Sequence, residues 1–159
     1  MTIVPPSSER QLGDEPTRAA GQTLDLILAA DWFSPSVARD RVRTWLRANG
    51  WPPAHTDDLV LAVNEAVSNS IEHGYDIGPE DLPTLDTVEV HGAIHRAPDG
   101  SRHVEMTIRD SGTWHTPTND DHSTRGQGLR LMRACVAHLT IDGHTTGTTV
   151  TLRSHPTPR

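Results

Sequence analysis

The sequence predicts an α+β fold, a two-layer α/β sandwich in which three helices lie on one face of a mixed, mostly antiparallel sheet. Two observations predict this fold. Segments of strand character and helical segments are mixed along the chain without strict alternation, which favours antiparallel pairing over a parallel sheet. The 159 residues are also enough for one domain with its own core, and too few for two full domains.

The predicted domain spans residues 21–154. Residues 1–20 contain three prolines, serines and charged residues without periodicity, so we expect a mobile N-terminal tail. Residues 155–159 are expected to form a loose C-terminal end.

The first strand is predicted over residues 23–30, an apolar run of strand length, although a buried helical segment would show the same run. The first helix begins at Ser34-Pro35, where a capping hydroxyl precedes a proline at the first helical position, and it ends at Asn49-Gly50. Its buried face is predicted to contain Ala38, Val42, Trp45 and Leu46.

The second helix is predicted over Asp57–His73. It opens with two acidic residues, which suit the positive end of a helix, and it stops at Gly74. Its buried stripe is predicted to contain Leu59, Val60, Val63, Val67 and Ile71.

A β-hairpin follows the loop at residues 76–84. Residues 88–94 and 103–108 alternate as two strands, and a Pro-Asp-Gly turn at residues 98–100 joins them. Residues 111–125 are polar without an apolar period, and a loop of this length is usually functional.

The third helix is expected to begin near Gly126 or Gly128. Two closing strands, at residues 138–141 and 148–153, flank a turn at residues 143–147. The apolar positions of the third helix are Leu129, Leu131, Met132 and Val136.

The charge balance excludes several classes of function. The 21 acidic residues outnumber the 14 basic ones, and every basic residue is an arginine. Without lysine, the chain has neither a Schiff-base nucleophile nor the lysine of a GxxxxGK[ST] phosphate loop. A net charge of -7 also argues against the basic stripe of a nucleic-acid-binding protein, so no direct nucleic-acid partner is expected.

The apolar segments predict no membrane span. None of them approaches the roughly 20 residues that a membrane helix requires, and the first 20 residues lack the pattern of a signal peptide. We therefore expect a cytoplasmic protein. The single cysteine, Cys135, cannot form an internal disulfide or a thiolate zinc site, and its apolar neighbourhood indicates a place in the core.

A carboxylate and an amide stand one turn apart on the second helix. Glu65 and Asn69 are separated by four residues, so they project from the same face. An amide oxygen can coordinate Mg²⁺ that also bridges phosphates, and a glutamate can accept the proton of an attacking hydroxyl. A solvated polar pair without function is the alternative interpretation of the same spacing.

A second carboxylate follows the strand EMTIRD. If Asp110 is buried at the end of that strand, it can accept a hydrogen bond from the amino group of adenine, whereas guanine would present an oxygen and be repelled. Gly112 would let a flat base approach the backbone. An Asx-turn that ends the strand is the alternative.

Glycines mark the start of the third helix. Gly126 and Gly128 flank a glutamine where loop becomes helix, and free N–H groups at such a place bind anions such as phosphate. Arg125 could add a bidentate charged contact. Gly147-Thr148 brings hydroxyl groups into the last strand, where an ordinary β-turn is the alternative.

The order of these motifs resembles a known family. ExxxN on a helix, DxG after a strand, GxGL at a helix start and GT before the final strand are arranged as in the Bergerat-fold (GHKL) ATP-binding domain, which is shared by DNA gyrase, sensor histidine kinases and MutL. The likeness is greatest to small anti-sigma-factor serine kinases of the RsbW and SpoIIAB type, because NEAVSNSIEHGY, residues 64–75, is similar to the N box of that group. The resemblance covers about residues 22–153.

The resemblance implies a role for each matching residue. Glu65 would be the general base, Asn69 the ligand of Mg²⁺ and Asp110 the reader of the adenine amino group, with Thr148 or Thr149 assisting through water. Gly126 and Gly128 would mark the end of the ATP lid and the phosphate site. The implied ATP-binding residues are Asn69, Asp110, Gly112, Arg125, Gly126, Gly128, Leu129, Thr148 and Thr149.

The resemblance also implies a function. Members of this group bind ATP with Mg²⁺, phosphorylate a serine on a STAS-domain anti-sigma-factor antagonist and hold a sigma factor inactive; several are dimers. This chain is thus expected to be a serine protein kinase and anti-sigma factor of a bacterial partner-switching system, with homodimer formation as a further expectation.

One position departs from the family pattern. Trp114 stands where a second glycine is expected, and its indole could cover the nucleotide or fill the pocket. If it fills the pocket, the domain is a catalytically silent interaction module that binds a regulator with weak or no ATP turnover.

The first helix carries a strip of arginines, Arg39, Arg43 and Arg47, at intervals of four residues. On an acidic protein this strip could bind an acidic partner, and related anti-sigma kinases use this helix region against their partners. A solvated helix face is the alternative.

Overall fold

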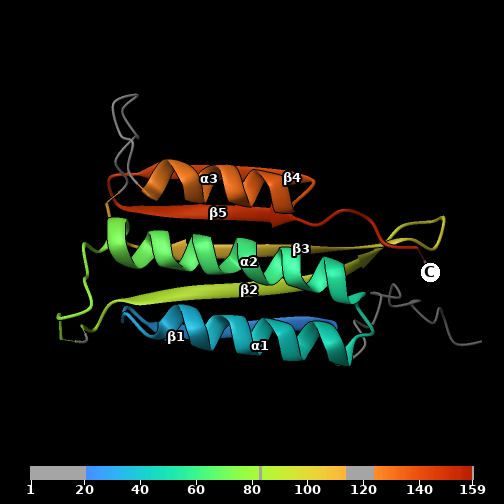
Figure 1. Cartoon of the computed structure of the whole chain (residues 1–159), viewed down its shortest axis with the longest axis horizontal. Helices are drawn as coiled ribbons and strands as arrows, with labels where there is room; N and C mark the ends of the chain where they lie inside the picture. Colours follow the sequence, from blue (N-terminus) through green and yellow to red (C-terminus); the bar gives the residue numbers. More distant parts are fainter. Residues whose placement is uncertain (1–20, 83, 114–123, 159) are drawn as a thin grey trace, which may run out of the picture.

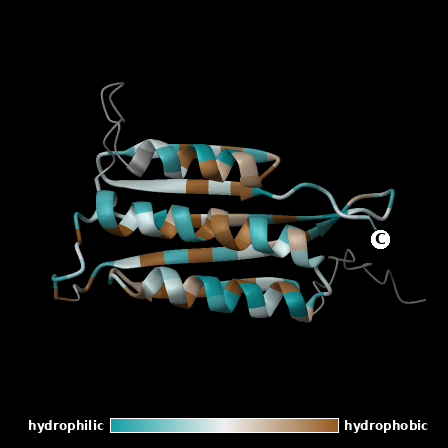
Figure 2. Cartoon of the chain, in the orientation of Figure 1, coloured by the Kyte–Doolittle hydropathy of each residue, from teal (hydrophilic) through white to brown (hydrophobic). Residues whose placement is uncertain are grey.

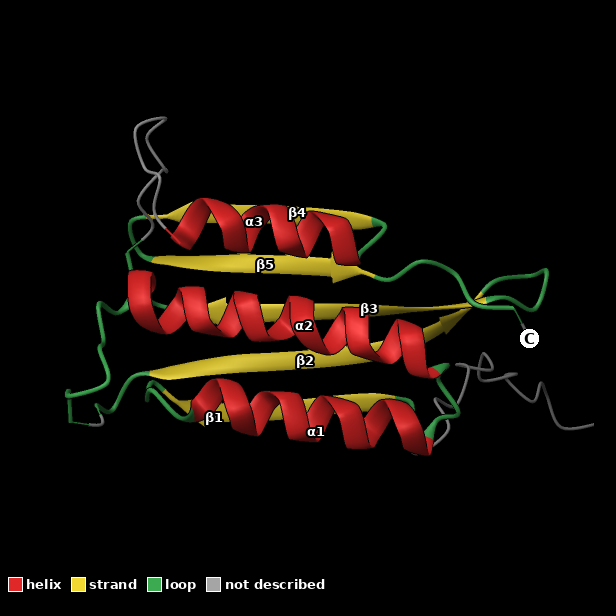
Figure 3. Cartoon of the chain, in the orientation of Figure 1, coloured by secondary structure: helices red, strands yellow, loops and turns green. Residues whose placement is uncertain are grey.

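The computed structural model describes residues 21–82, 84–113 and 124–158. In these segments three α-helices lie side by side on one face of a five-stranded sheet, as Figures 1 and 3 show. The helices are α1 (Ser34–Ala48), α2 (Pro53–Asn69), which continues as a short π-helix, η1 (Ser70–Gly74), and α3 (Thr124–Cys135). The strands are β1 (Thr23–Ala29), β2 (Thr87–Arg96), β3 (Arg102–Asp110), β4 (His138–His144) and β5 (Gly147–Arg153).

The sheet has the order β1-β2-β3-β5-β4, and every neighbouring pair of these strands is antiparallel. The expected α+β sandwich is therefore confirmed. Two hairpins, β2–β3 and β4–β5, meet where β3 pairs with β5, and β1 forms one edge of the sheet. The α3 segment carries the chain over the sheet between β3 and β4, so that β5 can pair with β3 (Figure 1).

The core lies between the helices and one face of the sheet. Alternate residues of β2 and β3 are buried beneath the helices, as the two-residue period of a strand requires. Figure 2 shows the corresponding change between hydrophobic and hydrophilic residues along the helices and strands. All the core positions predicted for the first two helices are buried: Ala38, Val42, Trp45, Leu46, Leu59, Val60, Val63, Val67 and Ile71.

The start of α1 differs in detail from the expected cap. The hydroxyl of Ser34 donates to the carbonyl oxygen of Ala29 at 2.5 Å and does not cap the helix. A carboxylate oxygen of Asp31 instead accepts the N–H of Phe33 at 2.7 Å. The hydroxyl therefore ties the helix to the end of β1. The expected stop is present, because Gly50 has a φ of +67° immediately after the helix.

The second helix begins earlier than predicted. It starts at Pro53, four residues before Asp57, because proline is well suited to the first helical turn and loses no hydrogen bond there. Asp57 and Asp58 lie beyond the first turn, so the macrodipole argument for a start at these acids was wrong. The helix also changes to the wider π geometry at Ser70, which the sequence pattern did not indicate.

The third helix also begins earlier than expected, at Thr124, which places Gly126 in its first turn and Gly128 in its second. Met132 is buried, whereas Leu131 is exposed, because it lies on the side of the helix away from α2 and the sheet. Val136 is also buried but follows the end of α3 at Cys135, so its expected place in the helix was wrong.

The C-terminal end is held to the sheet at Thr157. Its backbone exchanges two hydrogen bonds with Arg102, at 2.8 and 3.0 Å, and its side chain is buried. The expectation of a loose end is therefore wrong at this position, because the edge of β3 offers free backbone groups beyond the end of β5.

Candidate functional site

The ends of four elements meet at one end of the molecule, on the left in Figure 1. They are the end of α2 with η1, the end of β3, the start of α3 and the β4–β5 turn. A small cavity of about 20 Å³ lies between them. It is lined by Ala66, Asn69, Ser70, Gly74, Asp110, Leu129, Met132, Ile141, Thr148 and Val150.

Three of the predicted polar residues face this cavity. Asn69 reaches it from the last turn of α2, and Asp110 from the last residue of β3. Thr148 is the partner of Asp110 in the β3–β5 register and is buried. Thr148 follows Asp110 by 38 residues and Asn69 by 79 residues, and yet the three side chains meet at one place. The β3–β5 register brings Thr148 beside Asp110, and the packing of α2 on the sheet adds Asn69.

Thr148 and Thr149 do not share a face of the sheet. Successive residues of a strand point to opposite sides, and Thr148 and Val150 both line the cavity. Thr149 therefore lies on the opposite face, in register with Arg109 and Asp142. The alternative that the sequence left open is resolved by this alternation, and only Thr148 is at the cavity.

Glu65 lies one turn before Asn69, at the seam between α2 and α3. A Cβ atom added to Gly128 would be 2.9 Å from a carboxylate oxygen of Glu65 and 3.7 Å from the side-chain oxygen and nitrogen of Asn69. The backbone of α3 therefore packs directly against both side chains. Gly128 lies opposite Glu65 and Asn69, inside the helix and not at the free N–H end where the phosphate site was expected.

The glycine of DxG packs against the backbone at the end of η1. A Cβ atom on Gly112 would be 2.2 Å from the carbonyl oxygen of Gly74 and 2.4 Å from its carbonyl carbon. Gly112 therefore allows the loop after β3 to close on the end of η1, and this close approach explains why a glycine is needed there.

Gly74 is a site residue that the sequence reasoning missed. It was interpreted only as a helix stop, yet it lines the cavity, and a Cβ atom there would be 3.3 Å from a carboxylate oxygen of Asp110. The signal that could have found it is its place at the end of NEAVSNSIEHGY, four residues after Ser70.

The π-helix brings Gly74 to this place. The N–H of Tyr75 donates to the carbonyl oxygen of Ser70 at 3.0 Å, five residues back, so the last turn is wider than an α-helical turn. Residues 71–74 are displaced along with it, and the carbonyl of Gly74 accepts the N–H of Thr113 at 2.9 Å. The end of the helix and the end of β3 are thereby joined.

The cavity is too small for a nucleotide in this conformation. A volume of about 20 Å³ holds about one water molecule, whereas pockets for small ligands measure roughly 300 Å³ or more. Leu129 and Met132 of α3 close the cavity from above. Trp114 lies outside the described residues, as does the side chain of Arg125, so their expected contacts remain predictions.

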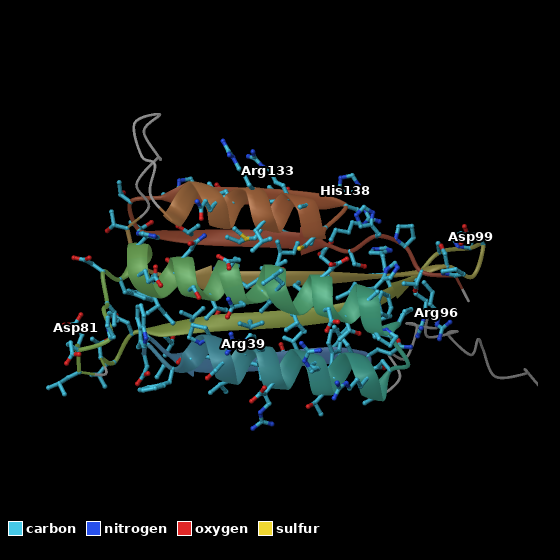
Figure 4. The ribbon with its side chains drawn as sticks, in the orientation of Figure 1. Arg39, Asp81, Arg96, Asp99, Arg133 and His138 are labelled. Atoms are coloured by element: carbon cyan, nitrogen blue, oxygen red, sulfur yellow. The ribbon has the colours of Figure 1, made fainter. Side chains whose placement is uncertain are left out.

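The arginine strip is partly bound within the chain. Arg39, labelled in Figure 4, donates to the side-chain oxygen of Asn64 at 3.3 Å, and Arg43 pairs with Asp57 at 2.6 Å. Both contacts cross from α1 to α2. Arg47, in the last turn of α1, is exposed. The strip is therefore not a continuous free surface.

A larger groove lies between α1 and α2, beside Arg39. It has a volume of about 330 Å³ and is lined by Trp32, Phe33, Pro35, Ser36, Arg39, Asn64, Ser68, Ile71 and Glu72. The aromatic ring of Phe33 is 73 % exposed at its rim, and Trp32 is 39 % exposed. No motif in the sequence indicated a role for these two aromatic residues.

Comparison with known proteins identifies the family. Residues 29–154 match the family described as the histidine kinase-like ATPase domain, which is most of the chain. The chain belongs to this family. The match covers all the elements described here except most of β1.

One solved structure extends this assignment. The chain is similar to the crystal structure of the RsbU and RsbW domains of Rv1364c from Mycobacterium tuberculosis, with 28 % sequence identity and a TM-score of 0.61. The alignment covers 86 % of this chain and 33 % of that one, so the chain spans about a third of that protein's length. The resemblance to a Bergerat-fold, RsbW-like ATPase domain is thus confirmed.

Within the described segments, no helix is both long enough and apolar enough to cross a membrane.

Proposed function

We propose that this ATPase-family domain is an ATP- and Mg²⁺-dependent serine protein kinase and anti-sigma factor that acts in the cytoplasm on a STAS-domain anti-sigma-factor antagonist. One observation carries the proposal: Asn69, Asp110 and Thr148 converge on one cavity, and Glu65 lies one turn before Asn69, against Gly128 of α3. The likeness to an RsbW domain supports the partner-switching role.

Asp110 and Thr148 would determine which base is bound. A carboxylate at the end of β3 accepts a hydrogen bond from the amino group of adenine and faces the oxygen of guanine with repulsion, a difference of about 1–3 kcal/mol. The neighbouring hydroxyl of Thr148 can hold a water between the base and the strand. The pair therefore favours ATP over GTP.

Asn69 would hold Mg²⁺. An amide oxygen is a hard ligand, and Mg²⁺ usually combines one or two protein oxygens with phosphates and water. A single amide at the end of α2 fits this pattern, because the remaining ligands come from the nucleotide and solvent. Bound ATP supplies the γ-phosphoryl group and the leaving ADP.

Glu65 would act on the protein substrate. Its carboxylate takes the proton from the hydroxyl of the partner's serine as the serine oxygen attacks the γ-phosphorus, so the oxygen–phosphorus bond to ADP breaks and a phosphoserine forms. The free N–H groups in the first turn of α3, which contains Gly126, and a cation held by Asn69 would supply the positive charge that stabilises the transferred group. Replacement of Glu65 thus affects transfer, whereas replacement of Asn69 affects Mg-ATP binding.

Nucleotide entry requires α3 to move away from α2. With Gly128 against Glu65 and Leu129 over the cavity, no nucleotide fits in the described conformation. The same observation favours the second candidate function, a catalytically silent interaction module in which the cavity stays closed. Calorimetric titration with ATP, ADP and GTP, each with and without Mg²⁺, separates the two. Adenine-selective binding supports the kinase, and no binding supports the silent module.

The chemical step has its own test. Glu65→Ala is expected to keep ATP binding and to abolish phosphorylation of a cognate STAS protein, and Asn69→Ala to weaken Mg-ATP binding. Arg133→Ala is a matched control, because Arg133 is exposed on the outer side of α3 in Figure 4. Normal phosphorylation by the Glu65→Ala variant would remove that carboxylate from the mechanism.

The groove between α1 and α2 is the proposed partner site. Exposed aromatic rings, Trp32 and Phe33, lie beside the guanidinium group of Arg39, a combination that is typical of interface centres. The groove lies on the α1 side of α2, whereas Glu65 faces α3, so a partner bound there would have to extend across α2 to bring its serine to the reacting groups. Phe33→Ala is expected to weaken binding of the STAS protein or sigma factor at least tenfold without altering ATP affinity, and Arg133→Ala, on α3, is the control. Equal binding by both variants would place the partner elsewhere.

A further inference from the structure

The three N–H groups that follow Asp110 are each bonded to a different acceptor. The N–H of Ser111 donates to the hydroxyl of Tyr75 at 2.8 Å, that of Gly112 to a carboxylate oxygen of Asp110 at 3.0 Å, and that of Thr113 to the carbonyl of Gly74 at 2.9 Å. Two of these acceptors come from the end of η1. The direction of the chain after Asp110 is therefore set by residues 74 and 75.

The Tyr75 hydroxyl replaces a hydrogen bond of the sheet. The β2–β3 pairing ends at Glu89 and Arg109. If it continued for two more residues, Thr87 would face Ser111. The hydroxyl of Tyr75 lies between them, because it accepts from the N–H of Ser111 and donates to the carbonyl oxygen of Thr87 at 2.7 Å.

The orientation of β2 supports this account. Alternate residues of a strand direct their backbone groups to opposite neighbours. The N–H of Ile94 and the carbonyl of Asp86 bond to the β1 side, at 3.0 and 2.8 Å, so the carbonyl of Thr87 faces β3. A direct bond from Ser111 to Thr87 is thus the regular continuation of the sheet, and the phenol separates the two strands at that point.

The hydroxyl is suited to this double role. The ring of Tyr75 packs against the core, and burial, together with the carboxylates of Asp110 and Asp86, raises the pKa of the phenol. The group therefore stays protonated at physiological pH and can donate to Thr87 while it accepts from Ser111.

We infer that Tyr75 is a positioning residue for Asp110: its hydroxyl opens the end of the β2–β3 pair and turns the Asp110 carboxylate toward the cavity beside Asn69. The inference depends on the proposed reading of adenine by Asp110. Without the hydroxyl, Ser111 can bond directly to Thr87, which would draw the end of β3 toward β2 and move the Asp110 carboxylate out of line with the base.

The test compares Tyr75→Phe with the unaltered chain in calorimetric titrations with Mg-ATP and Mg-GTP. The expected result is a loss of about tenfold in the preference for ATP over GTP, because the selective hydrogen bond is misdirected. Val90→Ala is the control. Val90 is buried on β2 and faces Ile108, not Asp110, so its truncation lowers stability without touching the hydroxyl or the carboxylate, and the preference should be unchanged.

Two further results separate this inference from the proposed function. An unaltered chain that binds ATP no better than GTP contradicts the adenine site itself. Selective binding by the unaltered chain with an unchanged preference in folded Tyr75→Phe, or an equal loss in Val90→Ala, overturns the positioning role alone. If Tyr75→Phe does not fold, Tyr75→Met, which also removes the hydroxyl but keeps a flexible apolar side chain, is expected to lower the preference to the same extent, and an unchanged preference in it also overturns the role.

Discussion

The contact between Gly112 and Gly74 makes a quantitative prediction for Gly112→Ala. A real Cβ atom is essentially never closer than 3.0 Å to such atoms, yet one placed on Gly112 would be 2.2 Å from the carbonyl oxygen of Gly74. The neighbouring atoms on this side are backbone atoms, so no flexible side chain can move out of the way. The loop after β3 and the end of η1 must separate by at least about 0.8 Å.

The cost has two parts. Overpacking of this kind costs about 1–3 kcal/mol, and lengthening the bond from the N–H of Thr113 to Gly74, now 2.9 Å, costs about 1 kcal/mol more. We expect Gly112→Ala to lower the free energy of unfolding by about 2–4 kcal/mol. For a domain of this size the melting temperature falls by roughly 4–16 °C.

Thermal and urea unfolding of the full chain measure this effect, with Gly78→Ala as the matched control. A Cβ atom on Gly78 would meet only a carboxylate oxygen of Asp81, at an ordinary 3.5 Å, so its stability should change by less than about 0.5 kcal/mol. If the two alanine variants melt at the same temperature, the close approach of Gly112 to Gly74 does not exist in solution and the reasoning is refuted.

Four further effects are expected. Met132→Ala should lower the free energy of unfolding by about 2–5 kcal/mol in urea titrations, because this side chain is fully buried above the cavity. Burial raises the pKa of the Cys135 thiol, so a thiol reagent near pH 8 should react with it far more slowly in the folded chain than in urea. Burial lowers the pKa of His103, so the unfolded chain binds this proton more tightly and stability should fall as the pH drops below about 6.5; His103→Gln should flatten that part of a melting-temperature profile. Arg43→Ala removes a half-exposed pair with Asp57 and should cost less than about 1 kcal/mol by chemical unfolding; a larger loss would mean that the pair is better shielded than its exposure indicates.

Local patterns were enough to predict most of the fold. The buried stripes of α1 and α2 and the alternation of the two hairpins follow from periods of 3.6 and two residues, which depend only on nearby positions. The order of the motifs was enough for the family. Helix starts were less well predicted, because Pro53 and Thr124 begin helices whose apolar period becomes visible only several residues later.

Part of the candidate site was also predictable. The spacing of Glu65 and Asn69 places them on one face of a helix whatever surrounds it, and Asp110 stands where an apolar strand ends. That Asp110 lies beside Asn69 could not follow from spacing, because the β3–β5 register and the packing of α2 on the sheet bring them together. The same long-range contacts place Thr148, and not its neighbour Thr149, at the cavity.

The sequence by itself determined the types of side chain, their helical and strand periods and the family to which their order belongs. Only the tertiary structure decided how the pieces close: Gly74 meets Gly112, the Tyr75 hydroxyl enters the sheet, and α3 rests on Glu65. The physical reason is range. Periodicity is set by backbone geometry over a few residues, whereas these contacts join residues tens of positions apart and depend on how every layer between them packs.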